Sequence, residues 1–463
     1  NFGDTEIVIP DSVFDDQHFI YASELTALAK AMLMIVNETG GGTEFDVTKA
    51  LNLSSADIDK FLDSEIIAAT VGKMIANLNV DMLTIPAEAE TSVEVDSVAV
   101  TVVKPTEIKS LLLSLQVLDL TNFDSMSFTA SLIDNFEDPD NPQTLDDELI
   151  FTFLDSLIVQ ASVSSMILDL GSGDSSLLVI PSVSSTNSSV IETVGTTDYI
   201  NVNEIGNLFK ALHVLNLGDD FNNIDLEDTS LLFDNLTLFL DSAILHATIS
   251  DQILSIDPAL LVIPAMDGDP VTPADILIQP AETTFIAKSE LENFVAGIQQ
   301  LGFNSPTDFT DTFTLSVMDE PSEQTTILDS AILHASISKK LIDFSDTVLI
   351  VPAVAEDGVT AITYQTGPVG DKTDYVAKTE ITSLIDALGI LGVTSVDGFS
   401  SLSLNNLFPS LVPSDYLDNQ NTLLASASMQ ATISSQMLGL GDSVLIVPDH
   451  DSVGVMVYHN VSG

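Results

Sequence analysis

A block of nine residues recurs five times along the 463-residue chain, and this repetition constrains the fold more than any single residue does. Four copies begin with Asp-Ser, all five hold Ala at the seventh position, and the copies start at Asp63, Asp155, Asp241, Asp329 and Ala425. Each copy leads into a short apolar run that ends in Pro, at Pro86, Pro181, Pro264, Pro352 and Pro448. Self-similarity at a regular period is the signature of a repeat architecture.

The repetition predicts five tandem units in place of the three or four domains that length alone would suggest. The predicted boundaries are 1–86, 87–181, 182–264, 265–352 and 353–448, followed by a C-terminal tail at 449–463. We name these units repeats 1 to 5. The predicted fold class is α+β. Each repeat is expected to run strand, helix, loop, helix, strand, and the repeats are expected to stack into an elongated array.

An amphipathic helix is expected near the start of each repeat, because a polar capping residue, a Glu and an apolar stripe of helical spacing occur there in order. In repeat 4 the stripe is Leu291, Phe294, Val295, Ile298 and Leu301. The expected caps are Ser23, Thr106, Asn203, Ser289 and Thr379, and the acids are Glu24, Glu107, Glu204, Glu290 and Glu380. Short β-type runs precede the caps, at 19–21, 98–103, 199–202, 285–287 and 375–377.

The nine-residue block itself is predicted to form a second helix, because Asp-Ser suits a helix N-terminus and apolar residues cover much of its circumference. A strand is the alternative, since Leu245, Ala247 and Ile249 alternate with less apolar residues. The nearly unbroken apolar runs that end in Pro are predicted to be central strands, each paired with the strand that follows it. These runs are 82–85, 177–180, 260–263, 348–351 and 444–447.

Residues 6–10 have the pattern of the apolar run that ends each repeat in Pro, although no repeat precedes them in the given sequence. Three interpretations stay open at this stage. The segment is the last strand of a preceding repeat in a longer array from which this sequence is cut, it joins the sheet edge of a neighbouring molecule by strand addition, or it caps its own first repeat. Strand addition repeated head to tail would produce an open filament.

The net charge of −57 disfavours partners that are themselves anionic. The chain has only twelve basic residues, all of them Lys, against 69 acidic residues. Nucleic-acid binding is therefore disfavoured, because it depends on Lys and Arg that neutralise phosphates. Docking on an anionic membrane surface is disfavoured for the same reason. The acidity suits either a saline habitat or deliberate cation binding, and close packing of such chains requires salt or cations to screen them.

Several features favour an extracellular or cell-surface location. No apolar run reaches the ~18–20 residues that span a bilayer. The chain begins at Asn1 without a basic and apolar leader, which is typical of a processed product. Asn-x-Ser/Thr sequons occur at Asn37, Asn52, Asn187, Asn235 and Asn460. The absence of Cys excludes disulfides and thiolate chemistry.

Calcium is the most plausible ligand, because it takes several oxygen ligands from carboxylates and carbonyl groups. Two acidic loops are candidate sites. The first holds Asp219, Asp220, Asn222 and Asp225, and the second holds Glu137, Asp138 and Asp140. Neither matches the twelve-residue calcium-loop motif, so solvated acidic loops are the alternative interpretation.

No catalytic residue is predicted. The five Glu that follow the caps are interpreted as first-turn acids that stabilise their own helices, because this explains all five together. His246 and His334 share one position of the block, where other copies hold Ala68, Gln160 and Gln430, so we interpret that position as helix surface. Nucleophile-elbow, phosphate-loop and zinc-protease motifs are absent from the sequence.

The sequence therefore favours a non-enzymatic, extracellular structural protein that assembles with itself into a filament or a surface layer, without a required cofactor. The alternative is a monomeric adhesin or stalk that presents variable acidic loops to a glycan or a protein, since variable loops on a constant scaffold usually carry specificity.

Overall fold

The fold is given by a computed structural model of the whole chain. It describes residues 7–38, 47–77, 83–118, 133, 135–138, 141–172, 178–214, 235–258, 261–264, 276–301, 321–343, 349–366, 372–391, 416–439, 449–450 and 456–457. Helix accounts for 59% and strand for 14% of the described residues, which confirms a mixed α+β class in which helices dominate.

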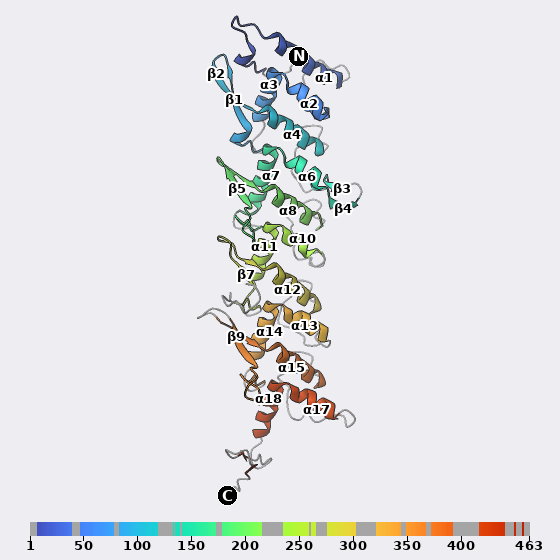
Figure 1. The fold of residues 1–463 in the computed structure, drawn as a ribbon, viewed down its shortest axis with the longest axis vertical. Helices are drawn as coiled ribbons and strands as arrows, with labels where there is room; N and C mark the ends of the chain where they lie inside the picture. Colours follow the sequence, from blue (N-terminus) through green and yellow to red (C-terminus); the bar gives the residue numbers. More distant parts are fainter. Residues whose placement is uncertain are drawn as a thin grey trace. The chain divides into compact units, whose positions relative to one another are not determined.

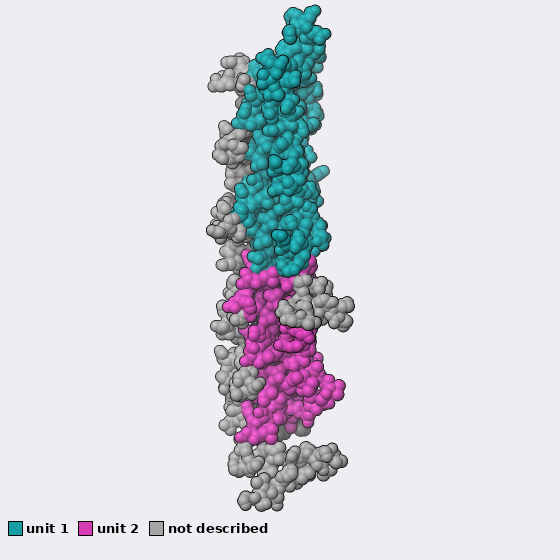
Figure 2. Space-filling view, turned by 90° about the vertical axis from the view of Figure 1, so that its left-hand side faces the viewer, with its two compact units in different colours: residues 1–226, 234–251, 279–285 teal, residues 227–233, 252–278, 286–463 magenta. Residues whose placement is uncertain are grey.

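The chain divides into two compact units, coloured separately in Figure 2. The first compact unit comprises 1–226, 234–251 and 279–285, and the second comprises 227–233, 252–278 and 286–463. Each has an apolar core built from helices, with fully buried Phe61, Phe153 and Phe209 in the first and Phe294 in the second.

Three helices recur in the described part of every repeat (Figure 1). The first-position helices are α1 (Ala22–Glu38), α4 (Pro105–Val117), α8 (Val202–Val214), α12 (Lys288–Gln300) and α15 (Lys378–Ile390). Short helices follow, namely α2 (Ser55–Leu62), α6 (Asp147–Leu154), α10 (Leu236–Asp241), α13 (Pro321–Asp329) and α17 (Tyr416–Ala425). The block helices are α3 (Glu65–Ala76), α7 (Leu157–Leu170), α11 (Ala243–Leu254), α14 (Ala331–Asp343) and α18 (Ala427–Leu438).

The nine-residue block is helical in all five copies, so the prediction of a second helix is confirmed. The short helix before each block was not predicted. The short helix and the block helix are separate because the Ser of the block is the N-cap of the block helix. Its hydroxyl accepts the N–H three residues ahead, as the hydroxyl of Ser64 accepts the N–H of Ile67. Between α6 and α7 the resulting bend is 100°.

The predicted caps of the first-position helices are wrong by about two residues. Ser23, Thr106, Asn203, Ser289 and Thr379 are each the second residue of their helix. Lys104, Ala287 and Ala377 occupy the N-cap of α4, α12 and α15, without a side-chain capping bond. A cap must adopt extended backbone just before the helix, and here the preceding strand continues directly up to that point.

All the named strands form two-stranded antiparallel hairpins. Four lie just before a first-position helix: β1–β2 (Glu90–Val95, Val98–Val103), β5–β6 (Ile191–Val194, Thr197–Ile200), β7–β8 (Leu277–Ile278, Phe285–Ile286) and β9–β10 (Thr363–Thr366, Thr373–Val376). Two others are β3–β4 (Glu137–Asp138, Asn141–Leu145) and β11–β12 (Asp449–His450, Met456–Val457). The expected strands at 98–103, 199–202, 285–287 and 375–377 thus correspond to β2, β6, β8 and β10, whereas 19–21 contributes only an isolated bridge from Ile20 to Phe14.

The apolar runs that end in Pro are not strands in their described parts, 83–86, 178–181, 261–264 and 349–352. The prediction that they are central strands paired with the following strand is therefore wrong. The run 444–447 lies outside the described residues. Short 3₁₀ helices complete the fold at η1 (Asp11–Val13), η2 (Val47–Asn52) and η3 (Ala87–Ala89).

Among the described residues, no single helix is both long and apolar enough to cross a bilayer. The pair α6 and α7 reaches the required length and hydropathy only when its two sharply bent halves are taken together.

Candidate functional site

Five glutamates of the first-position helices are buried, which is uncommon for a side chain that carries a charge. Their exposed fractions lie between 4% and 7%, for Glu24, Glu107, Glu204, Glu290 and Glu380. A buried carboxylate costs free energy unless it is paired or hydrogen-bonded, so the partners of these side chains decide what they do.

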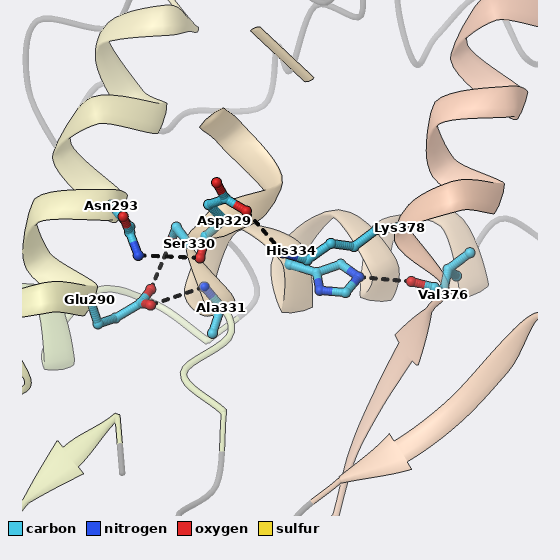
Figure 3. A network of polar contacts seen from close by, with 8 residues as sticks. All are labelled: Glu290, Asn293, Asp329, Ser330, Ala331, His334, Val376 and Lys378. Carbon is cyan, nitrogen blue, oxygen red and sulfur yellow. Dashed lines mark hydrogen bonds and ion pairs between the residues drawn. The ribbon is translucent and has the colours of Figure 1, made fainter. Parts of the chain in front are cut away.

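The partners of Glu290 show the arrangement (Figure 3). Its Oε1 accepts hydrogen bonds from the hydroxyl of Ser330 at 2.7 Å and the N–H of Ile332 at 3.0 Å. Its Oε2 accepts the N–H of Ala331 at 3.0 Å. These donors form the N-terminus of the block helix α14, 40 to 42 residues further along the chain, so Glu290 caps a different helix from its own.

The same contact occurs at the other four glutamates. The block Ser donates to the carboxylate at 2.5 to 2.7 Å in the pairs Ser64–Glu24, Ser156–Glu107, Ser242–Glu204 and Ser426–Glu380. Backbone N–H groups at the start of each block helix donate as well, including those of Ile66, Ile158, Ile244 and Ser428. The prediction that these acids stabilise their own helices is wrong in this respect: each sits in the first turn of one helix but bonds the N-terminus of another.

The environment of two of these carboxylates shifts their pKa. Burial raises the pKa of Glu107 and of Glu290 above the ordinary value, and the hydrogen bonds from the block helix oppose that shift. Three donors already converge on Glu290. A group so engaged is arranged to hold two helices together, which differs from a general acid or base that must face a reacting molecule.

The apolar runs are held by hydroxyl groups of block helices. Val8, Thr84, Val179, Val262 and Ile350 each donate a backbone N–H to one such hydroxyl, at 2.8 to 3.1 Å. The acceptors, in the same order, are Thr70, Ser162, Thr248, Ser336 and Thr432, all at the eighth position of the block. From Thr84 onward, the run of one repeat lies against the block helix of the next. A side-chain hydroxyl thus replaces the neighbouring strand that we had expected.

The run at residues 7–10 follows the same rule within repeat 1. Val8 is buried and its N–H bonds Thr70 of α3, which is the place that the run of a preceding repeat occupies in later repeats. Within the single chain the described part of this segment, residues 7–10, therefore lies on its own first repeat, and the interpretations that involve a neighbouring molecule or a longer array stay predictions.

A second set of contacts joins a block helix to the hairpin that follows it. In the first compact unit, Ser164 accepts the N–H of Ile200 at 2.9 Å, and Gln160 donates to the carbonyl of Ile200 at 3.1 Å. In the second, Ser338 accepts the N–H of Val376 at 3.0 Å. We name such a pair of side chains, which bonds the N–H and the carbonyl of one strand residue, a clamp. Gln160 and Ser164 are four residues apart and therefore share one helical face.

His334 completes the clamp on Val376, because its Nε2 bonds the Val376 carbonyl at 2.7 Å (Figure 3). Burial lowers the pKa of His334, so the neutral imidazole donates this bond. His246 is equally buried and its ring lies 4.9 Å from that of Phe285. The interpretation of this block position as helix surface is therefore wrong. Gln160 and His334 both donate to a backbone carbonyl there, whereas Gln430 donates to the carboxylate of Glu356.

Repeat 1 departs from this pattern at two positions of α3. Gly72 stands where Ser164 and Ser338 stand elsewhere, and a Cβ on Gly72 would lie 2.5 Å from the Val103 oxygen. The backbone of β2 therefore approaches α3 too closely for any side chain. Ala68 replaces the Gln or His, and it lines an adjoining cavity of about 150 Å³ together with Ser12 and Glu65.

Lysines link consecutive repeats at the surface. Lys109 pairs with Asp59 at 2.6 Å, Lys210 with Asp147 at 2.5 Å, and Lys378 with Asp329 at 3.3 Å. In each pair the Lys belongs to a first-position helix and the Asp to the short helix of the repeat before it. The pairs are exposed, so each contributes at most about 1 kcal/mol and serves mainly to fix register.

The candidate calcium loops are largely outside the described residues. This holds for Asp219, Asp220, Asn222, Asp225 and Asp140. Glu137 and Asp138 form β3, whose register against β4 shifts between these two residues. Within the described part of the chain, no group of three or more His, Asp or Glu side chains is placed to hold a metal ion.

No protein-family model, no curated protein and no solved structure matches this chain.

Proposed function

We propose that this chain is a non-enzymatic, extracellular structural protein, built from five tandem copies of one module, that assembles with itself into a filament or a surface layer. The observation that carries the proposal is the recurrence of one set of contacts. Each repeat buries a carboxylate against the N-terminus of its own block helix and offers hydroxyls to the backbone of its neighbour. Polar groups that an enzyme would direct at a substrate are here used between elements of the protein.

The charge of the chain agrees with this proposal. A protein with 69 acidic and 12 basic residues repels itself in dilute solution, so its assembly would respond to salt and to divalent cations. Screening by about 1 M salt shortens the range of this repulsion to about 3 Å. Calcium bound by the acidic loops is the cation we propose, with Asp219, Asp220, Asn222 and Asp225 as one site and Glu137, Asp138 and Asp140 as the other.

A monomeric adhesin or stalk is the second candidate. The observation that favours it is the β3–β4 hairpin, which lies between the first-position helix and the short helix of repeat 2 and carries part of an acidic segment. A glycan or protein partner would then bind the segments between these two helices, whose sequences differ among the repeats while the helices recur.

Negative-stain electron microscopy of the purified chain tests the proposal. The chain is imaged over a hundredfold range of concentration, in high salt, with calcium and with a chelator. Fibres or sheets that grow with concentration are expected, and their loss in chelator alone would assign the cation to the contacts. Single particles of constant size under every condition would contradict self-assembly and favour the adhesin.

A further inference from the structure

The N-terminal side of repeat 1 exposes apolar residues that are buried in every other repeat. The backbone hydrogen bonds establish which residues correspond. The N–H groups of Tyr21, Lys104, Asn201, Ala287 and Ala377 all bond a carbonyl of the segment between the apolar run and the first-position helix, at 2.7 to 2.9 Å. Phe19, two residues before Tyr21, therefore corresponds to Val102, Tyr199, Phe285 and Tyr375.

The difference in burial at these positions is large. Phe19 is 66% exposed, whereas its four counterparts are at most 5% exposed. Leu25, which follows the buried Glu24, is 50% exposed, whereas Ile108, Ile205, Leu291 and Ile381 are at most 1% exposed. We name Phe19, Tyr21 and Leu25 the head face.

In later repeats these positions pack on the repeat before them. The strand β2 contacts α3, β6 contacts α7, and β10 contacts α14. The helix α4 contacts α2 and α3, α8 contacts α6, and α15 contacts α13. The head face thus has the composition of one half of a junction between repeats, with its other half uncovered.

The block helix α18 of repeat 5 exposes the opposite half. Ser434 corresponds to Ser164 and Ser338, which are fully buried under a following strand, yet Ser434 is exposed. Met437 on the same helix is 40% exposed, whereas its counterparts Ile167 and Leu341 are 3% and 6% exposed. We name Ser434 and Met437 the tail face.

The charge distribution on α18 agrees with burial in a contact. No residue of α18, from Ala427 to Leu438, is acidic or basic, although the chain carries 69 acidic residues. A helix surface that meets only water has no reason to avoid charge in so acidic a protein. The face that receives the apolar edge of another repeat must avoid it, because an unpaired buried charge is costly, and α3, α7 and α14, which receive such an edge, keep charges such as Glu65, Asp169 and Lys339 at exposed positions.

We infer that the head face of one molecule docks on the tail face of a second copy of this chain. The inference rests on the proposed function and specifies its contact. The backbone of Phe19 and Ile20 would lie on α18 as Tyr199 and Ile200 lie on α7, and Ser434 would accept the N–H of Ile20 as Ser164 accepts that of Ile200. The contact is heterologous, so each complex keeps one free face at each end, and copies add into an open filament wherever the rotation between them does not close a ring.

Two blocked variants test the contact in about 1 M NaCl, by light scattering coupled to size exclusion. The double variant F19S/L25S removes the head face, and Ser434→Trp blocks the tail face. All three residues are exposed in the single chain, so folding should be retained, which circular dichroism checks. The matched controls are Phe151→Ser and Gln252→Trp, which alter exposed residues of α6 and α11.

The unmodified chain and both controls are expected to grow in mass with concentration, and each blocked variant alone is expected to stay at 49.3 kDa. An equimolar mixture of the two blocked variants retains one head and one tail, so it should yield a complex of twice that mass and nothing larger. Assembly of the blocked variants to the same extent as the unmodified chain would overturn this contact while self-assembly stands. A constant mass for the unmodified chain would overturn the proposed function and the contact with it.

Discussion

Removing the carboxylate of Glu290 should loosen the N-terminus of α14. In Glu290→Ala the buried N–H of Ile332 loses its acceptor, and such a donor costs about 1–3 kcal/mol when left unsatisfied. Ala331 is only partly buried, and the hydroxyl of Ser330 can rotate to another acceptor. We therefore expect a loss of about 1–3 kcal/mol in the stability of the second compact unit.

The isosteric variant Glu290→Gln separates the hydrogen bonds from the charge. Its amide oxygen can still accept from Ser330 and Ile332, but its amide nitrogen would face the N–H of Ala331. The expected loss is about 1 kcal/mol. Glu292→Ala changes an exposed acid two residues away on the same helix, and it should alter stability by less than about 0.5 kcal/mol.

The variants also differ in their dependence on pH. The pKa of Glu290 is raised by burial, so the folded state binds the carboxyl proton more tightly than the unfolded state does. The stability that protonation supplies is present in full below the unfolded pKa and is lost as pH rises through the folded pKa. Because Gln does not titrate, the advantage of the unmodified chain over Glu290→Gln should shrink across that window and stay constant above it.

Urea unfolding followed by circular dichroism gives the stability, and hydrogen exchange of the peptide containing Ala331 and Ile332 reports on the affected helix itself. Exchange there should accelerate at least about tenfold in Glu290→Ala and remain unchanged in Glu292→Ala. Equal unfolding midpoints and equal exchange rates for these two variants would refute the role of Glu290 as an anchor.

Three further predictions follow from the contacts between repeats. Gly72→Ser should destabilise the first compact unit by about 1–3 kcal/mol in urea unfolding, because its Cβ would strike the Val103 oxygen, and an unchanged midpoint would show that β2 can move away. In His334→Gln the bond to the Val376 carbonyl should survive, as it does at Gln160. Because burial lowers the pKa of His334, the unmodified chain loses stability as pH falls below the unfolded histidine pKa of about 6.5, and the variant should lack this loss in thermal scans at pH 5 and 7. The midpoint of thermal unfolding should rise as NaCl is increased from 0.05 to ~1 M, since a net charge of −57 opposes compaction, and a falling midpoint would contradict this.

The helices could be predicted from the sequence because each depends on local periodicity. The stripe of Leu291, Phe294 and Ile298 is buried as its spacing requires, and the block containing Ala335 is helical. The ends of the helices were less predictable. Thr379 has the chemistry of a cap, yet Ala377 occupies the N-cap of α15.

The apolar runs show where local pattern is insufficient. Val179 lies in a four-residue apolar run, which fits a central strand, yet its N–H is bonded by Thr248, 69 residues away. Short apolar runs do not distinguish a strand from another buried extended segment. The recurrence of a hydroxyl at the eighth position of every block was the available signal, since a hydroxyl on a buried helix needs a polar partner.

The role of the glutamates was hidden for a similar reason. Glu290 and Ser330 are 40 residues apart, and neither residue alone indicates the other. Both recur in all five repeats, however, and an acceptor paired with a helix-starting hydroxyl at every copy is consistent with a shared contact. For the acidic loops, the composition indicates calcium binding. This stays a prediction, because most of their residues lie outside the described part of the chain.

Sedimentation velocity of the unmodified chain, measured over a wide range of concentration in about 1 M NaCl, tests the central claim most directly. Head-to-tail assembly predicts a sedimentation coefficient that increases with concentration without reaching a plateau, because each added copy presents a new free face. A single 49.3 kDa species at every concentration would contradict the claim that this chain is the building block of a larger structure.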